Sequence, residues 1–168
     1  MRRIISMLLQ NEAGALARVA GMFSARGYNI DSLTVAATHE PAVSRLTLVT
    51  TGDDVVIAQI IKQSRKLVDV IEIADLTSRE HLEYELMIVK VAVALSSAAQ
   101  LSACVQRHAR AIVVADEATT RTIQFTGTGV ELNAFLSELA ASATILELAR
   151  SGTAALDCGE RVLSDVAA

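Results

Sequence analysis

Apolar and polar positions change period several times along the first half of the chain. Residues 2–9 form an apolar run that ends at a polar turn, which predicts a strand. After this turn, apolar side chains recur three and four residues apart, as on one face of an amphipathic helix; they are Leu16, Val19, Ala20 and Phe23. The first two predicted elements are therefore a strand and a helix.

The pattern then returns to strands, and the helical period appears once more. Extended patterns are predicted at 30–37 and 44–51, with Pro41 in the turn between them. A second helical stripe follows, and a last strand is predicted at 68–76; the stripe comprises Ile57, Ile60, Ile61 and Leu67. Gly27 is predicted to be the C-cap of the first helix, and the acids at 53 and 54, after Gly52, suit the start of the second.

The same order of elements repeats in the second half. Strands are predicted at the ranges 81–93, 111–116, 121–127 and 144–150. Two helical stripes lie between them: Leu101, Cys104, Val105 and His108, then Leu132, Phe135, Leu136 and Leu139. Ser97–Gln100 and Thr128–Glu131 both match a capping box. Residues 151–168 form a polar, Ala-rich tail that we expect to be loosely ordered.

This order predicts an α+β protein with two tandem ferredoxin-like βαββαβ domains. Two βαβ crossovers of one hand place both helices of a domain on one face of a four-stranded antiparallel sheet. We expect a first domain at 1–77 and a second domain with a short polar tail at 78–168. The other sheet face would be bare, which favours burial against another copy or another domain.

Composition excludes several classes of protein. With 52% hydrophobic residues the chain builds a compact core, but the aromatic content of 3% and the absence of Trp leave no stacking platform for single-stranded nucleic acid. The net charge of −4 and scattered Lys and Arg argue against a phosphate-backbone binder. The apolar runs are far shorter than the roughly 20 residues of a membrane-spanning helix. Because MRRIISMLL leads into a strand without a small-residue cleavage site, we expect a mature cytoplasmic chain.

Reactive residues give no sign of catalysis. Cys104 and Cys158 form no CxxC motif, so neither a metal site nor a disulfide is indicated. The three histidines are dispersed without a triad, and the glycines at 127 and 129 are too weak a signal for a nucleotide loop. Glu83 and Glu85 lie two apart on a strand, a spacing typical of a solvated face. These residues argue against an enzyme.

The turn before the first helix has the features of a small anion site. Free amide N–H groups of Gly14, Ala15 and Leu16 are expected to point out of the helix start, where the macrodipole is positive. The carboxamides of Asn11 and Asn29 suit an ammonium group, and apolar Leu16 and Ile30 suit an aliphatic side chain. Together these groups fit a free amino acid.

An ordinary structural role is the alternative, and spacing alone favours it. Asn11 would cap the helix and Gly14 would relieve a tight turn. Gly27, Tyr28 and Asn29 would then form no more than a C-cap and a corner.

Longer motifs resemble a known family. The first half contains N-E-x-G-x-L at 11–16, RGYNI-x-SLTVA at 26–36, S-R-L-T at 44–47 and KLVDV at 66–70. These are similar to the N-terminal ACT domain of the regulatory small subunit of acetohydroxyacid synthase, also called acetolactate synthase. The second half resembles that family's other domain more loosely, through ELMIVKV (85–91), FTGT (125–128), LNAFL (132–136) and ELARSGTAAL (147–156). The Ala- and Ser-rich segment 94–121 departs from the family.

The resemblance implies a non-catalytic subunit without a cofactor of its own. Its partner would be the catalytic large subunit, which would carry thiamine diphosphate, Mg and FAD and supply branched-chain amino acid synthesis, including that of isoleucine. The small subunit would raise the activity of this enzyme and confer feedback inhibition by valine.

The resemblance also implies where valine binds. The effector would lie between two ACT domains of a homodimer. One side would comprise Asn11, Ala13, Gly14, Ala15 and Leu16, and the other side, from the second protomer, Asn29 and Ile30.

Two other functions remain as alternatives. A stand-alone ACT-domain amino-acid sensor would regulate a different enzyme through the same turn. A sensor acting in a transcription factor is disfavoured because the sequence has no helix-turn-helix segment.

Overall fold

The structure, a computed structural model, describes residues 1–94 and 98–163. The chain divides into two compact units, which are described separately. The first comprises Met1–Leu82 together with the described residues after Gly152, and the second comprises Glu83–Gly152.

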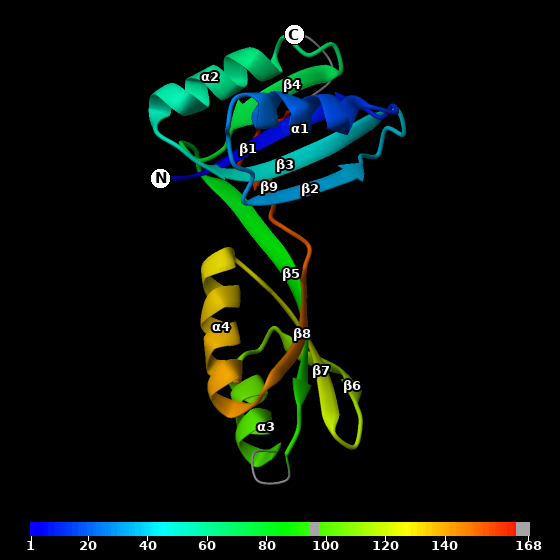
Figure 1. The fold of residues 1–168 in the computed structure, drawn as a ribbon, viewed down its shortest axis with the longest axis vertical. Helices are drawn as coiled ribbons and strands as arrows, with labels where there is room; N and C mark the ends of the chain where they lie inside the picture. The colour runs from blue at the N-terminus through cyan, green and yellow to red at the C-terminus, as the bar shows by residue number, and fades with distance from the viewer. Residues whose placement is uncertain (95–97, 164–168) are drawn as a thin grey trace. The chain divides into compact units, whose positions relative to one another are not determined.

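The first unit has the predicted βαββαβ order. Its elements are β1 (Arg2–Gln10), α1 (Ala15–Ala25), β2 (Ser32–Ala37), β3 (Val43–Thr51), α2 (Asp54–Ser64) and β4 (Val70–Asp75). The antiparallel sheet has the strand order β2-β3-β1-β4, and both helices lie on one of its faces (Figure 1). Helix α2 ends before Leu67, which packs against the core from the following turn.

Alternating side chains of the central strands build the core under α1 and α2. Ile5, Met7 and Leu9 of β1 point to the helices and are at most 1% exposed. Val19 and Phe23 of α1 meet them, as the helical stripe predicted. The amphipathic pattern therefore fixed which face of α1 is buried.

Gly27 ends α1 in the predicted way. Its φ of 68° lies in the left-handed region, which glycine adopts without steric cost. The amide of Gly27 donates to Ser24 O at 3.1 Å and that of Tyr28 to Phe23 O at 3.0 Å. This is a Schellman motif, so the C-cap prediction is confirmed.

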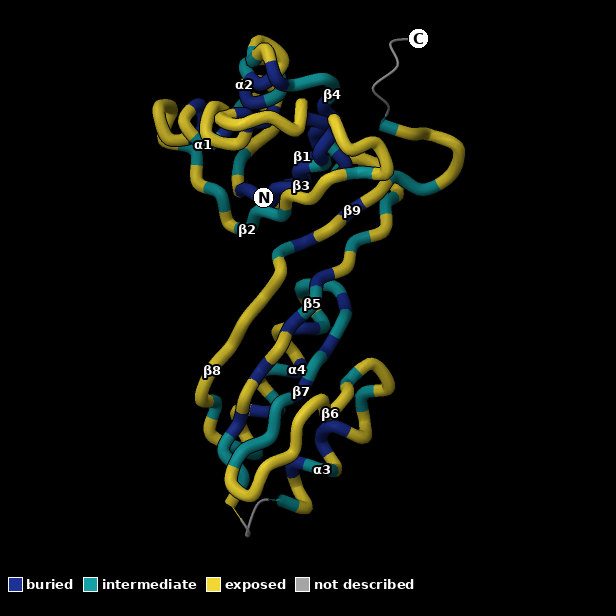
Figure 2. The backbone as a smooth tube through the Cα atoms, turned by 90° about the vertical axis from the view of Figure 1, so that its right-hand side faces the viewer, coloured by how far each residue is buried: buried dark blue, intermediate teal, exposed yellow. Residues whose placement is uncertain are grey.

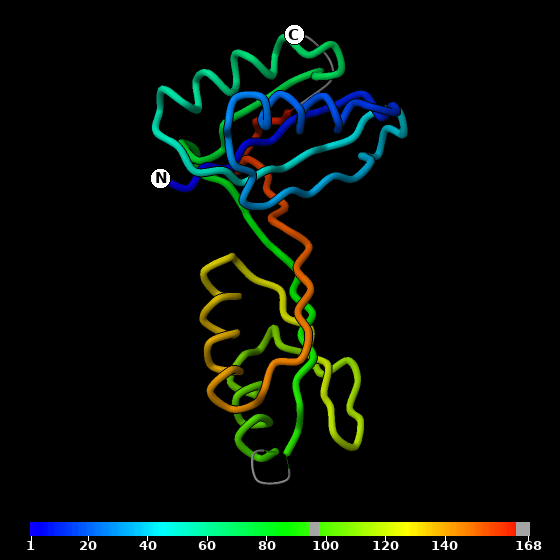
Figure 3. The backbone as a smooth tube through the Cα atoms, in the orientation of Figure 1, coloured from blue at the N-terminus to red at the C-terminus, as the bar shows by residue number. Residues whose placement is uncertain are grey.

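The second unit repeats the order of the first. It contains β5 (His81–Ala92, which begins in the first unit), α3 (Ala98–Arg107), β6 (Ala111–Asp116), β7 (Thr120–Gly127), α4 (Gly129–Ser142) and β8 (Ile145–Arg150). The strand order is β6-β7-β5-β8, with α3 and α4 on one side (Figure 3). The outer strands β6 and β8 are exposed over most of their length (Figure 2). The two-domain ferredoxin-like prediction is confirmed.

Thr128 caps α4 with a reciprocal pair of hydrogen bonds. Its hydroxyl accepts from the Glu131 amide at 3.3 Å, and the Glu131 carboxylate accepts from the Thr128 amide at 2.8 Å. The predicted capping box at 128–131 is thus confirmed, whereas the one expected at Ser97–Gln100 includes Ser97, which lies outside the described residues.

Removing this cap should weaken the second unit. Thr128→Ala is expected to lower the free energy of unfolding by about 1 kcal/mol, because an orphan helix donor loses its acceptor. Urea unfolding followed by circular dichroism measures the change. Ser137→Ala, on the exposed side of the same helix, is the matched control and should shift stability by less than about 0.5 kcal/mol. Equal effects of the two substitutions would contradict a capping role.

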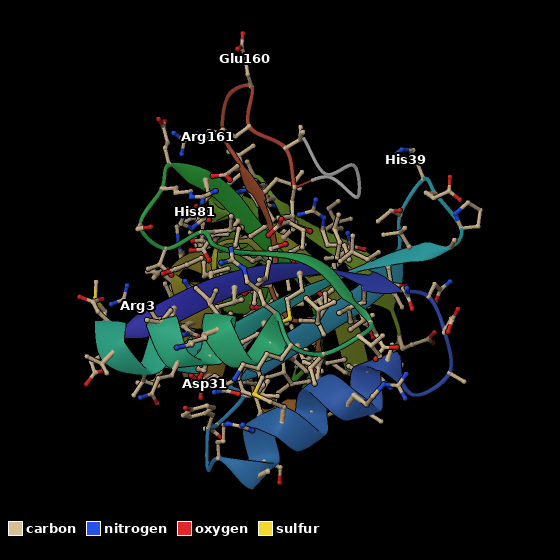
Figure 4. All side chains as sticks on the ribbon, turned by 90° about the horizontal axis from the view of Figure 1, so that it is seen from above. Arg3, Asp31, His39, His81, Glu160 and Arg161 are labelled. Carbon is tan, nitrogen blue, oxygen red and sulfur yellow. The ribbon has the colours of Figure 1, made fainter. Side chains whose placement is uncertain are left out.

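The C-terminal residues differ from the expected loose tail. Residues Ala154–Asp157 form strand β9, on the side of the first sheet opposite α1 and α2 (Figure 4). Ala155 is 4% exposed in a cluster with Ile4, Val49, Ala74 and Leu76, against which Leu163 also packs. The amide of Thr153 donates to Ser32 Oγ at 3.2 Å. Ala155 and Leu163 are the apolar residues through which this segment covers the sheet.

This cover corrects one expectation. The second face of the first sheet is not left bare within one chain, because β9 and Leu163 bury part of it. The described residues after Gly152 belong to the same compact unit as Met1–Leu82. Hydrophobic periodicity and composition did not predict that the C-terminal segment packs on the first unit, because this is a long-range contact made by a short segment.

Glu85 is also placed differently from the expected solvated face. It is 6% exposed and accepts two hydrogen bonds from Arg150, at 2.8 Å from Nε and 2.7 Å from Nη2. These bonds raise the pKa of Arg150. A buried carboxylate held by a bidentate arginine explains why a charge is tolerated at this strand position.

Candidate functional site

The turn between β1 and α1 is built around Gly14. Gly14 is the N-cap of α1 with φ 91°, and no side chain caps the helix. Asn11 instead donates from its side-chain Nδ2 to Pro41 O at 2.9 Å, and its backbone N–H donates to Ala42 O at 2.7 Å. Asn11 therefore ties the turn to the β2–β3 connection, and the alternative role as a helix cap is wrong.

The start of α1 carries amide groups without acceptors. In the described part of the chain, the N–H groups of Gly14, Leu16 and Ala17 donate to no protein carbonyl or side chain. The Ala15 amide, which the sequence predicted to be free, donates to Glu12 O at 3.3 Å. Ala15 is 3% exposed, whereas Ala13, Gly14 and Leu16 are exposed. Unpaired donors at the positive end of a helix suit an anion.

Arg18 and Asp69 lie at this turn and were missed by sequence reasoning. Arg18 donates from Nε and Nη2 to the two carboxylate oxygens of Asp69, the second bond at 2.6 Å. Asp69 is 2% exposed. The hydrogen bonds from Arg18 lower the pKa of Asp69 and those to Asp69 raise the pKa of Arg18. Two features of the sequence could have indicated these residues. Side chains on a helix point toward its N-terminus, which directs Arg18 to the turn, and Asp69 lies in the KLVDV motif.

The guanidinium of Arg18 occupies the space that glycine leaves at position 14. An added Cβ on Gly14 would lie 2.9 Å from Arg18 Nη1. The left-handed φ of 91° favours glycine at this position, and a larger residue would also displace the Arg18 guanidinium.

Asn29 and Ile30 lie in the loop before β2. Asn29 is exposed and donates from Nδ2 to Asp31 Oδ1 at 2.5 Å, while its carbonyl accepts from Thr50 Oγ1 at 2.6 Å. Ile30 is half-buried against the core of the first unit. Both residues are thus fixed at the end of β3 where Thr50 lies.

One chain does not bring the two groups of predicted site residues together. The Gly14 turn lies beside the start of β3 at Val43, and Asn29 lies beside Thr50 near its end. A strand rises about 3.3 Å per residue, so these positions are about 23 Å apart. Figure 4 shows the neighbours of the two groups, Asp31 and His39, at opposite ends of the sheet. Each chain carries two separate half-sites.

His108 and the two cysteines lie in packed or half-buried positions. His108 lies edge-on to both Phe125 and Phe135, with ring centroids 5.8 and 4.8 Å away, as expected for a packed residue. Cys104 is buried in the second unit, and Cys158 is half-buried in the first. Among the described residues, no group of three or more His, Cys, Asp or Glu is arranged to hold a metal ion. No helix in residues 1–94 or 98–163 is long and apolar enough to span a membrane.

The fold and the glycine turn define an ACT-domain protein of regulatory type. Residues 5–72 match the family described as the AHAS small subunit-like ACT domain, and residues 84–159 match that described as the small subunit of acetolactate synthase.

Known proteins of the same length identify the particular family. The chain is 44% identical to the acetolactate synthase isozyme 3 small subunit of Salmonella typhimurium and 43% identical to that of Escherichia coli, each over 97% of this chain and 99% of the relative. The crystal structure of the acetolactate synthase small subunit from Thermotoga maritima matches with a TM-score of 0.86 at 30% identity, covering 96% of this chain and 99% of that one. The chain belongs to the acetolactate synthase small-subunit family.

Proposed function

We propose that this chain is the non-catalytic regulatory subunit that activates the catalytic subunit of acetolactate synthase and makes it sensitive to valine. Thiamine diphosphate, Mg and FAD would reside in that catalytic partner, and both subunits would act in the cytoplasm. The domain at 1–77 would bind the effector. The observation that carries the proposal is the set of acceptor-free amides at the Gly14 turn, in a chain whose relatives are named small subunits.

The chemistry of the half-sites fits a zwitterion with an aliphatic side chain. The carboxylate would accept from the amides of Gly14 and Leu16. Asn11 and Asn29 each use Nδ2 within the protein, which leaves their carboxamide oxygens to accept from an ammonium group. Leu16 is 41% exposed and Ile30 is half-buried, so both offer apolar surface to a branched side chain.

A homodimer joins the half-sites. Strand β2 is an edge of the first sheet, and residues 35–37 in it are exposed. Antiparallel pairing of two β2 strands across a two-fold axis reverses one sheet relative to the other. The Asn29 end of each chain then meets the Gly14 turn of its partner, which gives two complete sites per dimer.

Valine is expected to strengthen this dimer. A ligand that contacts two chains stabilises their association by mass action. Sedimentation velocity at a protein concentration near the dissociation midpoint should show a shift toward dimer when valine is added. Glycine, which lacks the apolar side chain, is the control ligand and should shift the equilibrium less. A monomer that ignores valine would contradict the shared site.

The function itself is tested with the catalytic subunit. Its activity should rise when this protein is added and should then fall as valine is titrated in. Parallel titrations with leucine and isoleucine give the selectivity, which an apolar pocket sets at about 1–3 kcal/mol per methylene. Valine binding without any effect on this enzyme would favour the alternative, a stand-alone sensor of a different enzyme.

A further inference from the structure

The Arg18 side chain lies at the start of α1 and is 46% exposed, with one edge of its guanidinium turned away from Asp69. Asp69 takes the hydrogen bonds of Nε and Nη2. In the part of the chain that the structure describes, Nη1 has no hydrogen-bond acceptor. Nη1 lies against Gly14, where an added Cβ would be 2.9 Å away. The free edge of the cation therefore adjoins the amides that also lack acceptors.

Hydrogen-bond donors for an anion converge at this turn. The N-terminus of a helix carries the positive end of the macrodipole, and the first turn of α1 has no acidic residue. Asp69 is 2% exposed and binds the opposite edge of the guanidinium, so it fixes the side chain without covering Nη1. The carboxylates of Asp69 and of exposed Glu12 both act on the charge of Arg18, so its contribution to an anion site lies in the placing of Nη1 beside the amides.

We propose that Arg18 binds the carboxylate of the amino-acid effector through Nη1, beside the amides of Gly14 and Leu16, and that Asp69 holds the guanidinium in position. The proposal rests on the proposed function, because it adds a residue to the same effector site. One carboxylate oxygen accepts from the amides and the other from Nη1. Arg18 thereby selects ligands that carry a full negative charge.

A purely structural role is the competing explanation. The Arg18–Asp69 pair also ties α1 to the segment before β4, where the Asp69 carbonyl accepts from the Gln10 amide at 2.9 Å. Loss of this structural contact would weaken the binding of every ligand at the turn by the same factor. Loss of a direct contact would weaken only ligands with a carboxylate, so the ligand's own charge separates the two roles.

Calorimetry with valine and valinamide applies this distinction. Valinamide keeps the ammonium and the side chain but replaces the carboxylate with a neutral amide. Arg18→Gln is expected to weaken valine binding by about tenfold or more, because a hydrogen bond between charged groups is lost. The same substitution should weaken valinamide binding by less than about threefold. Equal factors for the two ligands, or unchanged valine affinity, would overturn the proposal.

Two further variants keep the test decisive. Arg18→Gln leaves Asp69 buried without its cation, so the double variant Arg18→Gln/Asp69→Asn removes both charges together. It should show the same selective loss of valine over valinamide. Arg26→Gln, at the far end of α1, is the matched control and should leave both affinities unchanged. If the unaltered protein binds no valine, the proposed function fails; if it binds valine and only the selective loss is absent, the role of Arg18 fails alone.

Discussion

Replacing Gly14 with aspartate is expected to raise the valine concentration for half-inhibition of acetolactate synthase by at least about tenfold, because like charges in contact cost several kcal/mol. The new Cβ would lie 2.9 Å from Arg18 Nη1, so the guanidinium would have to shift, and the added carboxylate would lie beside it. It would also occupy the acceptor-free amides at the helix start. The left-handed φ of 91° adds local strain. The effector's carboxylate would then meet a negative charge in its own place.

The measurement is an inhibition curve of the catalytic subunit in complex with each variant. Activation in the absence of valine should persist, because the substitution lies in an exposed turn. Gly21→Asp is the matched control, since it adds the same charge to the same helix at a position with open space and without a positive φ. Unchanged valine sensitivity in the Gly14 variant would show that this turn does not bind the effector.

A second large effect is expected in the core of the second unit. Phe135 of α4 is fully buried and stacks on Phe125 of β7, with ring centroids 4.6 Å apart. Phe135→Ala should lower the free energy of unfolding by about 3–5 kcal/mol, because it removes a large apolar side chain and leaves a cavity. His108 would lose its aromatic neighbour at the same time.

Urea unfolding followed by circular dichroism measures this loss, and hydrogen exchange localises it. Protection of amides in β7 and α4 should fall with the stability of the unit. Val130→Ala on the same helix is the control, since Val130 is 80% exposed and should change stability by less than about 0.5 kcal/mol. Comparable losses in the two variants would place Phe135 outside the core.

The sequence predicted the elements well because local periodicity determines them. Val19 and Phe23 of the predicted stripe lie in the buried face of α1, whereas Leu16 is 41% exposed. Gly27 ends α1 and Thr128 caps α4, as their chemistry requires. Family motifs located the Gly14 turn and the Asn29 corner. Their separation within one chain followed only from the sheet register, which places them at opposite ends of β3.

What the sequence did not reveal depends on contacts between distant residues. Asp69 meets Arg18 across the fold, and Glu85 meets Arg150 across two strands. From the sequence alone, a charged residue on a strand or in a turn is interpreted as solvent-exposed, because its distant ion-pair partner is not visible in the pattern. The pairing of Ala15 with Glu12 likewise depended on the geometry of one turn.

The return of the C-terminal residues to the first unit has a consequence for biosynthesis. The second unit is, in topology, an insertion between Leu82 and Thr153. During translation the N-terminal sheet emerges first, but the part of its second face around Ile4 and Leu76 stays uncovered until Ala155 and Leu163 have left the ribosome. A chain that stops at Gly152 would therefore leave this apolar patch exposed to solvent.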